Sequence, residues 1–442
     1  MNRAVVRAAL LLAAFCLAVG VTGGVGYAVS MRAAMSRPPE AVTLTRAPPA
    51  PRYDPGKPTV AVVLGDYLSE VTDVLGPYGL FAASGAYNVY TVASSRAART
   101  LTGNLDVIPH FSFGDLDARL GRGPEIVVVP ALPDVAAPEN RPLLAWLQKR
   151  AGDSLLFSWC TGAEVLAEAG LLGGRAATAH WADLGRLRRR YPDVRWQRGV
   201  RYLDGGDVLS AAGLTAGIDA TLYLLGRRHG QAFAKRVARE ARYPSLRFVA
   251  SPQMEPYTLG PRDAVYALNA MFGWRKQRTG VWLSDGIGEL ELASIFDVYA
   301  ASWTNRLYTA ARRRVVRSEH GLLLVARHTP ADRTSDSLSL DRLLISGTTE
   351  LPLNPLELGE GGVTRLHLTP AFAFDSPLKD LALTHDVPTA AFAVKRLEYR
   401  PRKLDLRGAG WPVHATLTAL ACGLAGVLGT CGLANRIRKK RR

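Results

Sequence analysis

One short segment near the middle of the chain restricts the fold more than any other. Residues 154–159 are apolar and aromatic and predict a buried strand, Cys160 follows at once, and residues 161–170 predict a helix. A strand that turns directly into a helix is typical of a parallel α/β sheet, and the turn lies at the sheet edge where ligands bind. The positive end of the helix would favour a thiolate there. Cys160 is therefore a candidate nucleophile, and the alternative is a small buried cysteine of the core.

Length and charge narrow the class of protein. With 442 residues the chain is long enough for two domains, each with its own core. The net charge of +17 comes from arginines scattered through both halves, with one dense run at residues 436–442, and this scatter argues against a nucleic-acid groove. No C-x-x-C pair occurs, and the glycines at 121–123 and 204–207 lack the context of a phosphate loop. Neither a metal nor a cofactor is indicated.

Both ends of the chain predict membrane segments. Residues 1–30 contain an uncharged apolar stretch that is long enough to cross a bilayer as an anchor, although a cleaved export signal has the same features. Residues 411–434 form a second span, followed by the basic tail 435–442. The tail favours a cytoplasmic C-terminus, which places residues 31–410 outside the cytoplasm; basic residues that flank the spans on the other side favour the reverse. We expect a cell-membrane protein with two spans and extracytoplasmic globular domains.

An internal repeat divides the region between the spans. Residues 59–91 and 277–309 match at a constant offset of 218 residues, each with a strand, an acidic loop and a helix. We therefore expect α/β domains at 58–248 and 278–400, with linkers at 31–57 and 249–277. The second copy lacks the strand–Cys–helix segment and has a Pro/Gly/Glu-rich stretch instead. It is expected to be a degenerate copy that supports or pairs with the first.

The first copy resembles a known superfamily over residues 58–248. The motifs are an ordered set spread over sixty residues: Cys160-Thr161-Gly162-Ala163, residues 166–175, Ala177-Thr178-Ala179-His180-Trp181, residues 191–194, 207–213 and 215–219. They resemble the PfpI/ThiJ superfamily, a branch of the class I glutamine-amidotransferase-like fold, and most closely the ligand domains of AraC-type regulators. The resemblance implies a flavodoxin-like three-layer α/β sandwich with a mostly parallel sheet. The helix-turn-helix module of those regulators is not expected, because the α/β pattern resumes after residue 277.

The residues and the resemblance together suggest a catalytic set. His180 follows Cys160 after a helix and a turn, so it could return to the same sheet edge and lower the pKa of the thiol. The resemblance points to Asp73 as the acid, although Glu70 competes because the register of that loop is ambiguous.

Backbone groups complete the predicted set. The amides of Thr161 and of Ala131 or Leu132 would serve as oxyanion donors. The family usually has glycines at the second position, where this chain has Ala131-Leu132-Pro133.

Three functions are compatible with the sequence. The protein could be a membrane-anchored ligand-binding protein, a Cys-dependent hydrolase or hydratase acting on a small carbonyl, amide or isonitrile compound, or a thiol-based redox or stress sensor. The expected partners are a small-molecule ligand or substrate, the lipid bilayer and a second copy of the chain as a homodimer, but no nucleic acid.

Overall fold

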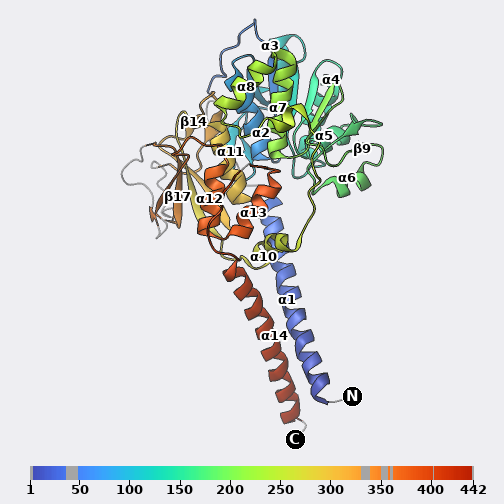
Figure 1. Ribbon diagram of the computed structural model, residues 1–442, viewed down its shortest axis with the longest axis vertical. Coiled ribbons are helices and arrows are strands. Elements are labelled where there is room, and N and C mark those ends of the chain that lie inside the picture. The colour runs from blue at the N-terminus through green and yellow to red at the C-terminus, as the bar shows by residue number, and fades with distance from the viewer. Residues whose placement is uncertain are drawn as a thin grey trace.

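The computed structural model describes residues 3–35, 48–329, 339–349, 357–358, 362–401 and 403–440. Figure 1 shows an α/β body above two long helices, which lie side by side and carry the two ends of the chain. Three predicted segments lie partly outside the described residues: the linker 31–57, the Pro/Gly/Glu-rich stretch for most of its length, and the basic tail for its last two residues.

A seven-stranded sheet organises the first half of the body. The strand order is β10-β11-β7-β6-β1-β2-β5, and every pair is parallel except β10 with β11. The prediction of a mostly parallel α/β sheet is therefore confirmed. The strands are β1 (Thr59–Val63), β2 (Asn88–Ala93), β5 (Phe111–Ser112), β6 (Ile126–Val129), β7 (Leu155–Ser158), β10 (Tyr202–Asp204) and β11 (Val208–Ala211).

Helices cover both faces of this sheet. Val60 and Val62 of β1 join one core cluster, and Ala61 and Val63 join the other, because successive strand residues point to opposite faces. A strand that is buried on both faces reads as a continuous apolar run, as β1 does. One layer contains α2 (Val71–Ser84), α7 (Leu214–His229), α8 (Gln231–Glu240) and α9 (Arg247–Ala250); the other contains α3 (Phe113–Leu120), α4 (Arg141–Arg150), α5 (Gly162–Glu168) and α6 (Leu184–Arg190).

A smaller parallel sheet follows in the second half, with the order β13-β12-β17-β19. Its strands are β12 (Gln277–Leu283), β13 (Asn305–Ala311), β17 (Arg342–Ser346) and β19 (Val363–Leu366), and its helices are α11 (Glu289–Ala300), α12 (Asp375–Thr384) and α13 (Val387–Arg396). The remaining short elements are β8 (Ala176–Ala177), β9 (Arg195–Trp196), β16 (Ser339–Leu340), β18 (Glu357–Leu358), and the 3-10 turns η1 (Pro138–Asn140) and η2 (Pro261–Asp263).

A third sheet joins the two halves. It contains β3 (Arg99–Leu101) and β4 (Leu105–Ile108) from the first half, and β14 (Val315–Arg317) and β15 (Leu323–Val325) from the second. The central pair is antiparallel, with Leu324 opposite Val107 and Val325 opposite Asp106. Helices α2 and α11 also pack together, and Thr72 donates a hydrogen bond of 3.0 Å to Asp297 across this contact. The two halves are thus joined by a shared sheet and by a contact between two helices.

Two helices extend away from the body: α1 (Arg3–Met35) and α14 (Val413–Lys440). Within them, Ala4–Arg32 and Val413–Gly432 are long and apolar enough to cross a membrane, although a signal sequence near the N-terminus would pass the same test. The helices touch where Gly423 faces Phe15. A third helix, α10 (Ala264–Phe272), packs on the upper part of α1, and Ser30 donates a hydrogen bond of 2.7 Å to the carbonyl of Ala270.

Candidate functional site

Cys160 occupies a strained turn between β7 and α5. Its φ of 54° lies in the left-handed region, which residues with a side chain rarely adopt. Gly162 allows the turn to close, because a Cβ atom there would lie 2.0 Å from the carbonyl oxygen of Val129. Cys160 as a whole is only 8% exposed. The predicted strand–Cys–helix geometry is present, but this burial does not favour the thiolate that was expected at the start of the helix.

Burial and nearby carboxylates oppose ionisation of the Cys160 thiol. The apolar surroundings raise its pKa well above the usual range, and the negative charges of Asp73, Glu70 and Asp183 raise it further. The backbone N–H of Thr161 acts in the opposite direction by donating to the sulfur. The thiol is therefore held in its protonated form at neutral pH.

Two acidic side chains lie at the start of α2. Glu70 caps the helix by accepting a hydrogen bond of 2.8 Å from the backbone N–H of Asp73. Burial raises the pKa of Asp73 from 3.8 to about 7, and a hydrogen bond from Ala131 limits the rise. The pKa of Glu70 is also raised well above its usual value by burial and by the charges of Asp297 and Asp73. Glu70 lines the cavity beside Cys160, whereas Asp73 lies behind it, completely buried.

The amide of Ala131, one of the two predicted oxyanion donors, already has a partner. Its backbone N–H donates a hydrogen bond of 2.9 Å to Oδ2 of Asp73, so this amide is already occupied by a carboxylate. The carbonyl of Ala131 in turn accepts from the backbone N–H of Glu70 at 2.9 Å. The loop after β6 therefore fixes the first turn of α2, whereas the backbone N–H of Thr161, the other predicted donor, contacts the sulfur of Cys160.

His180 lines the same cavity as Cys160, but both ring nitrogens face other groups. Nε2 lies 2.9 Å from the carbonyl oxygen of Arg396, and Nδ1 lies 3.7 Å from Oδ2 of Asp183. Burial lowers the pKa of His180, but the carboxylates of Asp183 and Glu398 outweigh that effect and raise it. A raised pKa favours an imidazolium held between acceptors over a free base beside the thiol.

Several residues of the second half complete the site, and sequence reasoning missed them. Arg396 donates a hydrogen bond of 2.8 Å to Asp297, whose carboxylate also faces Glu70. The backbone carbonyl of Arg396 forms a hydrogen bond with His180. The following residue, Leu397, accepts a hydrogen bond of 3.1 Å from the backbone N–H of Thr215. The contacts of Arg396 with His180 and of Leu397 with Thr215 join positions about two hundred residues apart, and no local spacing in the chain signals them.

A buried ion pair holds this crossing segment in place. Arg201 is 1% exposed and forms a salt bridge with Asp219, which is fully buried. The same guanidinium donates to the carbonyl of Glu398 at 2.8 Å and to the hydroxyl of Thr215 at 3.0 Å. The Glu398 carboxylate fits because Gly213 has no side chain: a Cβ atom there would lie 2.5 Å from the carboxyl carbon. The segment from Arg396 to Glu398 is therefore built into the first half.

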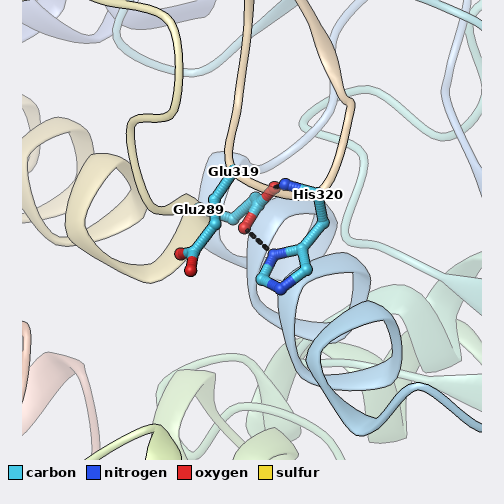
Figure 2. Close-up of side chains that lie close together, drawn as sticks. All are labelled: Glu289, Glu319 and His320. Carbon is cyan, nitrogen blue, oxygen red and sulfur yellow. Dashed lines mark hydrogen bonds and ion pairs between the residues drawn. The ribbon is translucent and has the colours of Figure 1, made fainter.

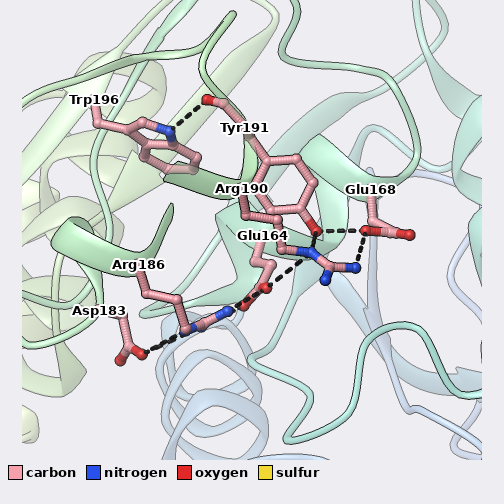
Figure 3. Close-up of polar contacts among 7 residues, drawn as sticks. All are labelled: Glu164, Glu168, Asp183, Arg186, Arg190, Tyr191 and Trp196. Atoms are coloured by element: carbon pink, nitrogen blue, oxygen red, sulfur yellow. Dashed lines mark hydrogen bonds and ion pairs between the residues drawn. The ribbon is translucent and has the colours of Figure 1, made fainter. Parts of the chain in front are cut away.

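Charged residues form one rim of the cavity (Figure 3). Arg186 of α6 donates two hydrogen bonds, of 2.6 and 2.7 Å, to Glu164 of α5, and a third of 3.2 Å to Asp183. Arg190, one turn further on, forms an ion pair of 3.2 Å with Glu168. The arginines therefore fix α6 against α5 and position Asp183 beside His180.

A second polar cluster lies away from this cavity (Figure 2). Ligand atoms of Glu289, Glu319 and His320 lie within 4.8 Å of one another, a spacing that could hold a metal ion. Both oxygens of Glu289 are already used, however: Oε2 contacts Nδ1 of His320 at 2.8 Å, and Oε1 accepts from Ser318 at 2.5 Å. The cluster is accounted for as an ion pair that holds the β14–β15 turn on α11.

A cavity of about 1600 Å³ connects the site residues. Cys160, Glu70 and His180 line it from the first half, and Asp297 and Arg396 line it from the second. It extends to α1, to Tyr266 of α10 and to Lys276, which precedes β12. The arrangement can hold a small molecule beside a protonated thiol and a pair of acids.

No protein-family model matches the chain. Among curated proteins it is similar to the HTH-type transcriptional regulator CdhR of Pseudomonas aeruginosa, with 37% identity over 99 residues, which are 22% of this chain and 29% of the regulator. It is also similar to the HTH-type transcriptional regulator GbdR of the same species, with 32% identity over 97 residues, or 22% of this chain and 26% of the regulator. The chain therefore spans less than a third of the length of these regulators.

A longer match links the chain to an enzyme. The isonitrile hydratase of Pseudomonas putida is 29% identical over 178 residues, which are 39% of this chain and 72% of the hydratase. Among solved structures, a THiJ/PfpI family protein from Pseudomonas syringae is 25% identical, with a TM-score of 0.39 over 47% of this chain and 80% of that protein. The resemblance to the PfpI/ThiJ superfamily predicted from the Cys160 and His180 motifs is confirmed: the relatives of this chain are AraC-type regulators, an isonitrile hydratase and proteins of the ThiJ/PfpI type.

Proposed function

We propose that the protein is a membrane-anchored ligand-binding protein whose small-molecule site surrounds Cys160 and is completed by the second half of the chain. The observation that carries this proposal is the cavity itself, because Cys160, Glu70 and His180 share it with Asp297 and Arg396. Ligand pockets are typically concave and mostly apolar, with a few converging polar groups, as here. Residues 58–248 then form the ligand domain, and residues 278–400 form a degenerate copy that acts as its fixed partner.

The pairing of the two halves supports a tandem origin. Residues 105–108 and 323–326 are equivalent at the repeat offset of 218 residues. In the central antiparallel pair, Val107 faces the equivalent of Asp106, and Asp106 faces the equivalent of Val107. This register is what a two-fold axis between two copies produces. The face through which two separate chains would pair is thus occupied within one chain, and a homodimer would have to use another surface.

Three features of the site favour binding without turnover. The Cys160 pKa is raised, the N–H of Ala131 is occupied by Asp73, and both ring nitrogens of His180 face other acceptors. A nucleophilic cysteine needs the thiolate, a nearby base and oxyanion donors. Each of these requirements would need a rearrangement of the site. A redox sensor would need an exposed thiolate, which the same burial disfavours.

The alternative function is a Cys-dependent hydratase or hydrolase. It is supported by the likeness to isonitrile hydratase, of which the chain covers 72%. It is also supported by Asp73, whose pKa of about 7 would let it keep or release a proton at neutral pH. A neutral substrate such as an isonitrile, an amide or an aldehyde suits a cavity whose wall near the sulfur carries carboxylates.

Anchoring and orientation are part of the proposal. The two long apolar helices at the ends of the chain support two spans. Arg436 and the basic residues after it support a cytoplasmic C-terminus, which places the α/β body outside the cytoplasm. Protease added to intact spheroplasts should then degrade the body. Protection of the body until lysis would reverse the orientation.

The test of function uses the full chain in lipid nanodiscs. Small neutral isonitriles, amides and aldehydes are screened for stabilisation of the folded protein, and their conversion is followed in parallel. Wild type should bind at least one class without converting it, and Arg396→Gln should weaken that binding. Cys422→Ser, a cysteine of α14 outside the cavity, is the matched control for Cys160→Ser. Turnover that Cys160→Ser abolishes and Cys422→Ser does not would show that the protein is an enzyme rather than a binding protein. Absence of both binding and turnover would overturn the proposal.

A further inference from the structure

The cavity that contains Cys160 also reaches the helix proposed to cross the membrane. On α1 the lining residues follow two adjacent stripes, Val21-Val25-Val29 and Thr22-Gly26-Ser30, each with the spacing of four that places side chains on one helix face. The three valines remain 57–61% exposed, so the body does not bury them. From Val21 to Met31 the lined length of helix is about 15 Å at 1.5 Å per residue.

The position of this stretch relative to a bilayer follows from its neighbours. The indole of Trp274 lies beside Gly26, and Trp411 precedes the second apolar helix. Tryptophans favour the membrane interface. A hydrocarbon core about 30 Å thick takes about 20 helical residues, so an interface at Gly26 places the opposite one near Arg7. Val21 and Val25 then lie at the edge of the hydrocarbon and also line the cavity.

The cavity wall changes character between this end and the sulfur. Next to α1 it continues over mostly apolar and aromatic side chains, including Tyr266, Phe296 and Ala300, with Lys276 beside α10 as a basic group in this part. At the far end it is lined by Cys160 and by the carboxylates of Glu70 and Asp183.

The charges at the far end restrict the head group of a ligand. Three guanidinium groups at this end of the cavity are already paired: Arg396 with Asp297, Arg186 with Glu164, and Arg190 with Glu168. Glu70 accepts a hydrogen bond from the backbone N–H of Asp73, and burial raises its pKa, so it offers this end a neutral acid rather than a charge. A neutral polar group therefore fits this end, and an apolar chain fits the other.

We infer that the ligand is a neutral single-chain amphiphile that enters from the adjacent bilayer leaflet, with its polar head beside Cys160 and its chain along Val21, Val25 and Val29. This inference rests on the proposed ligand site and on the proposed anchoring of α1. Entry from the leaflet lets the chain remain in an apolar environment throughout, which avoids exposing it to water. The volume of about 1600 Å³ exceeds the roughly 300–1,000 Å³ of pockets for drug-sized ligands, as a chain-bearing molecule requires.

Photo-crosslinking tests the inference in phosphatidylcholine vesicles that contain the full chain. The probe is a monoacylglycerol with a diazirine in its acyl chain, and mass spectrometry locates its adducts. Adducts are expected on cavity-lining residues of α1 and on α11. Val25→Trp and, from the opposite wall, Ala300→Trp should each reduce them about tenfold, which corresponds to about 1.4 kcal/mol of lost affinity. Leu12→Trp, on an exposed part of α1 that does not line the cavity, should leave them unchanged.

The possible outcomes separate the inference from the proposed function. Adducts spread over the outer surfaces of α1 and α14, unaffected by Val25→Trp and Ala300→Trp, would overturn the inference and leave anchoring intact. Equal labelling of the cavity by a water-soluble short-chain glycerol ester with the same diazirine would also overturn it and indicate entry from water. Failure of the chain to remain with the vesicles would overturn the anchoring and the inference together. Thermal unfolding of each variant shows whether the tryptophan disturbs the fold.

Discussion

Replacing Asp73 with asparagine tests the electrostatics of the site. Because burial raises the pKa of Asp73 from 3.8 to about 7, the folded chain keeps a proton in this range that the unfolded chain releases. The stabilisation from that proton is lost as pH rises through the window. The asparagine oxygen can still accept the hydrogen bond from Ala131, and its neutral amide resembles the protonated acid. We therefore expect Asp73→Asn to match wild type at low pH and to be more stable at high pH.

The magnitude follows from the same values. Between pH 5 and pH 8 wild type should lose about 3 kcal/mol of stability through Asp73, at 1.36 kcal/mol for each pH unit over which the proton is released. For a folded domain of about 150–250 residues, this loss of stability corresponds to a fall in Tm of about 6–12 °C. Asp73→Asn should lack this fall. The exposed carboxylate of Asp193, on the same half, provides the control Asp193→Asn, which should keep the wild-type pH profile.

The assay is thermal unfolding of the full chain in one detergent, followed by tryptophan fluorescence at pH 5 and pH 8. Trp159, which is completely buried next to Cys160, reports on this half of the molecule. Parallel pH profiles for wild type and Asp73→Asn, or a variant less stable than wild type at pH 8, would refute the assignment of a raised pKa to Asp73.

Three further perturbations address the turn and the buried ion pair. Arg201→Met should cost about 3–5 kcal/mol, because it leaves the buried Asp219 carboxylate unpaired, and the double variant Arg201→Met/Asp219→Leu should lose less. Urea unfolding measures both losses of stability, and a larger loss in the double variant would contradict the role of the ion pair. Cys160 should react with iodoacetamide at pH 7 more slowly than free cysteine, because burial raises its pKa. Equal reaction rates for Cys160 and free cysteine would contradict the raised pKa. Gly162→Ala should cost about 1–3 kcal/mol through its clash with Val129, and an unchanged Tm would count against a closed turn.

The sequence predicts the local parts of the site well. The apolar run before Cys160 and the helix after it specify the turn, because neighbouring residues determine strand and helix formation. The identity of Gly162 agrees with that turn, since only glycine can approach Val129 so closely. The resemblance points to Asp73 as the acid, and the structure has this residue in the first turn of α2.

Contacts between distant elements could not be predicted in the same way. Arg396 caps His180 from a helix of the second half, and this depends on how the two halves dock. The contact between the amide of Ala131 and the side chain of Asp73 was not predicted either, because sequence spacing does not specify the direction of that side chain. The repeat predicted two copies of a strand and helix, but not the joint sheet in which Val107 faces Leu324.

That joint sheet has a consequence for synthesis of the chain. The edge of β4 is complete only after β15, about two hundred residues later, has left the ribosome. At 5–20 residues per second this delay is roughly 10–40 s. An unpaired edge strand is a site where other chains can add, so the nascent first half would be prone to aggregation during that time. The protein should therefore depend on a chaperone, or on slow release of its first half, during biogenesis.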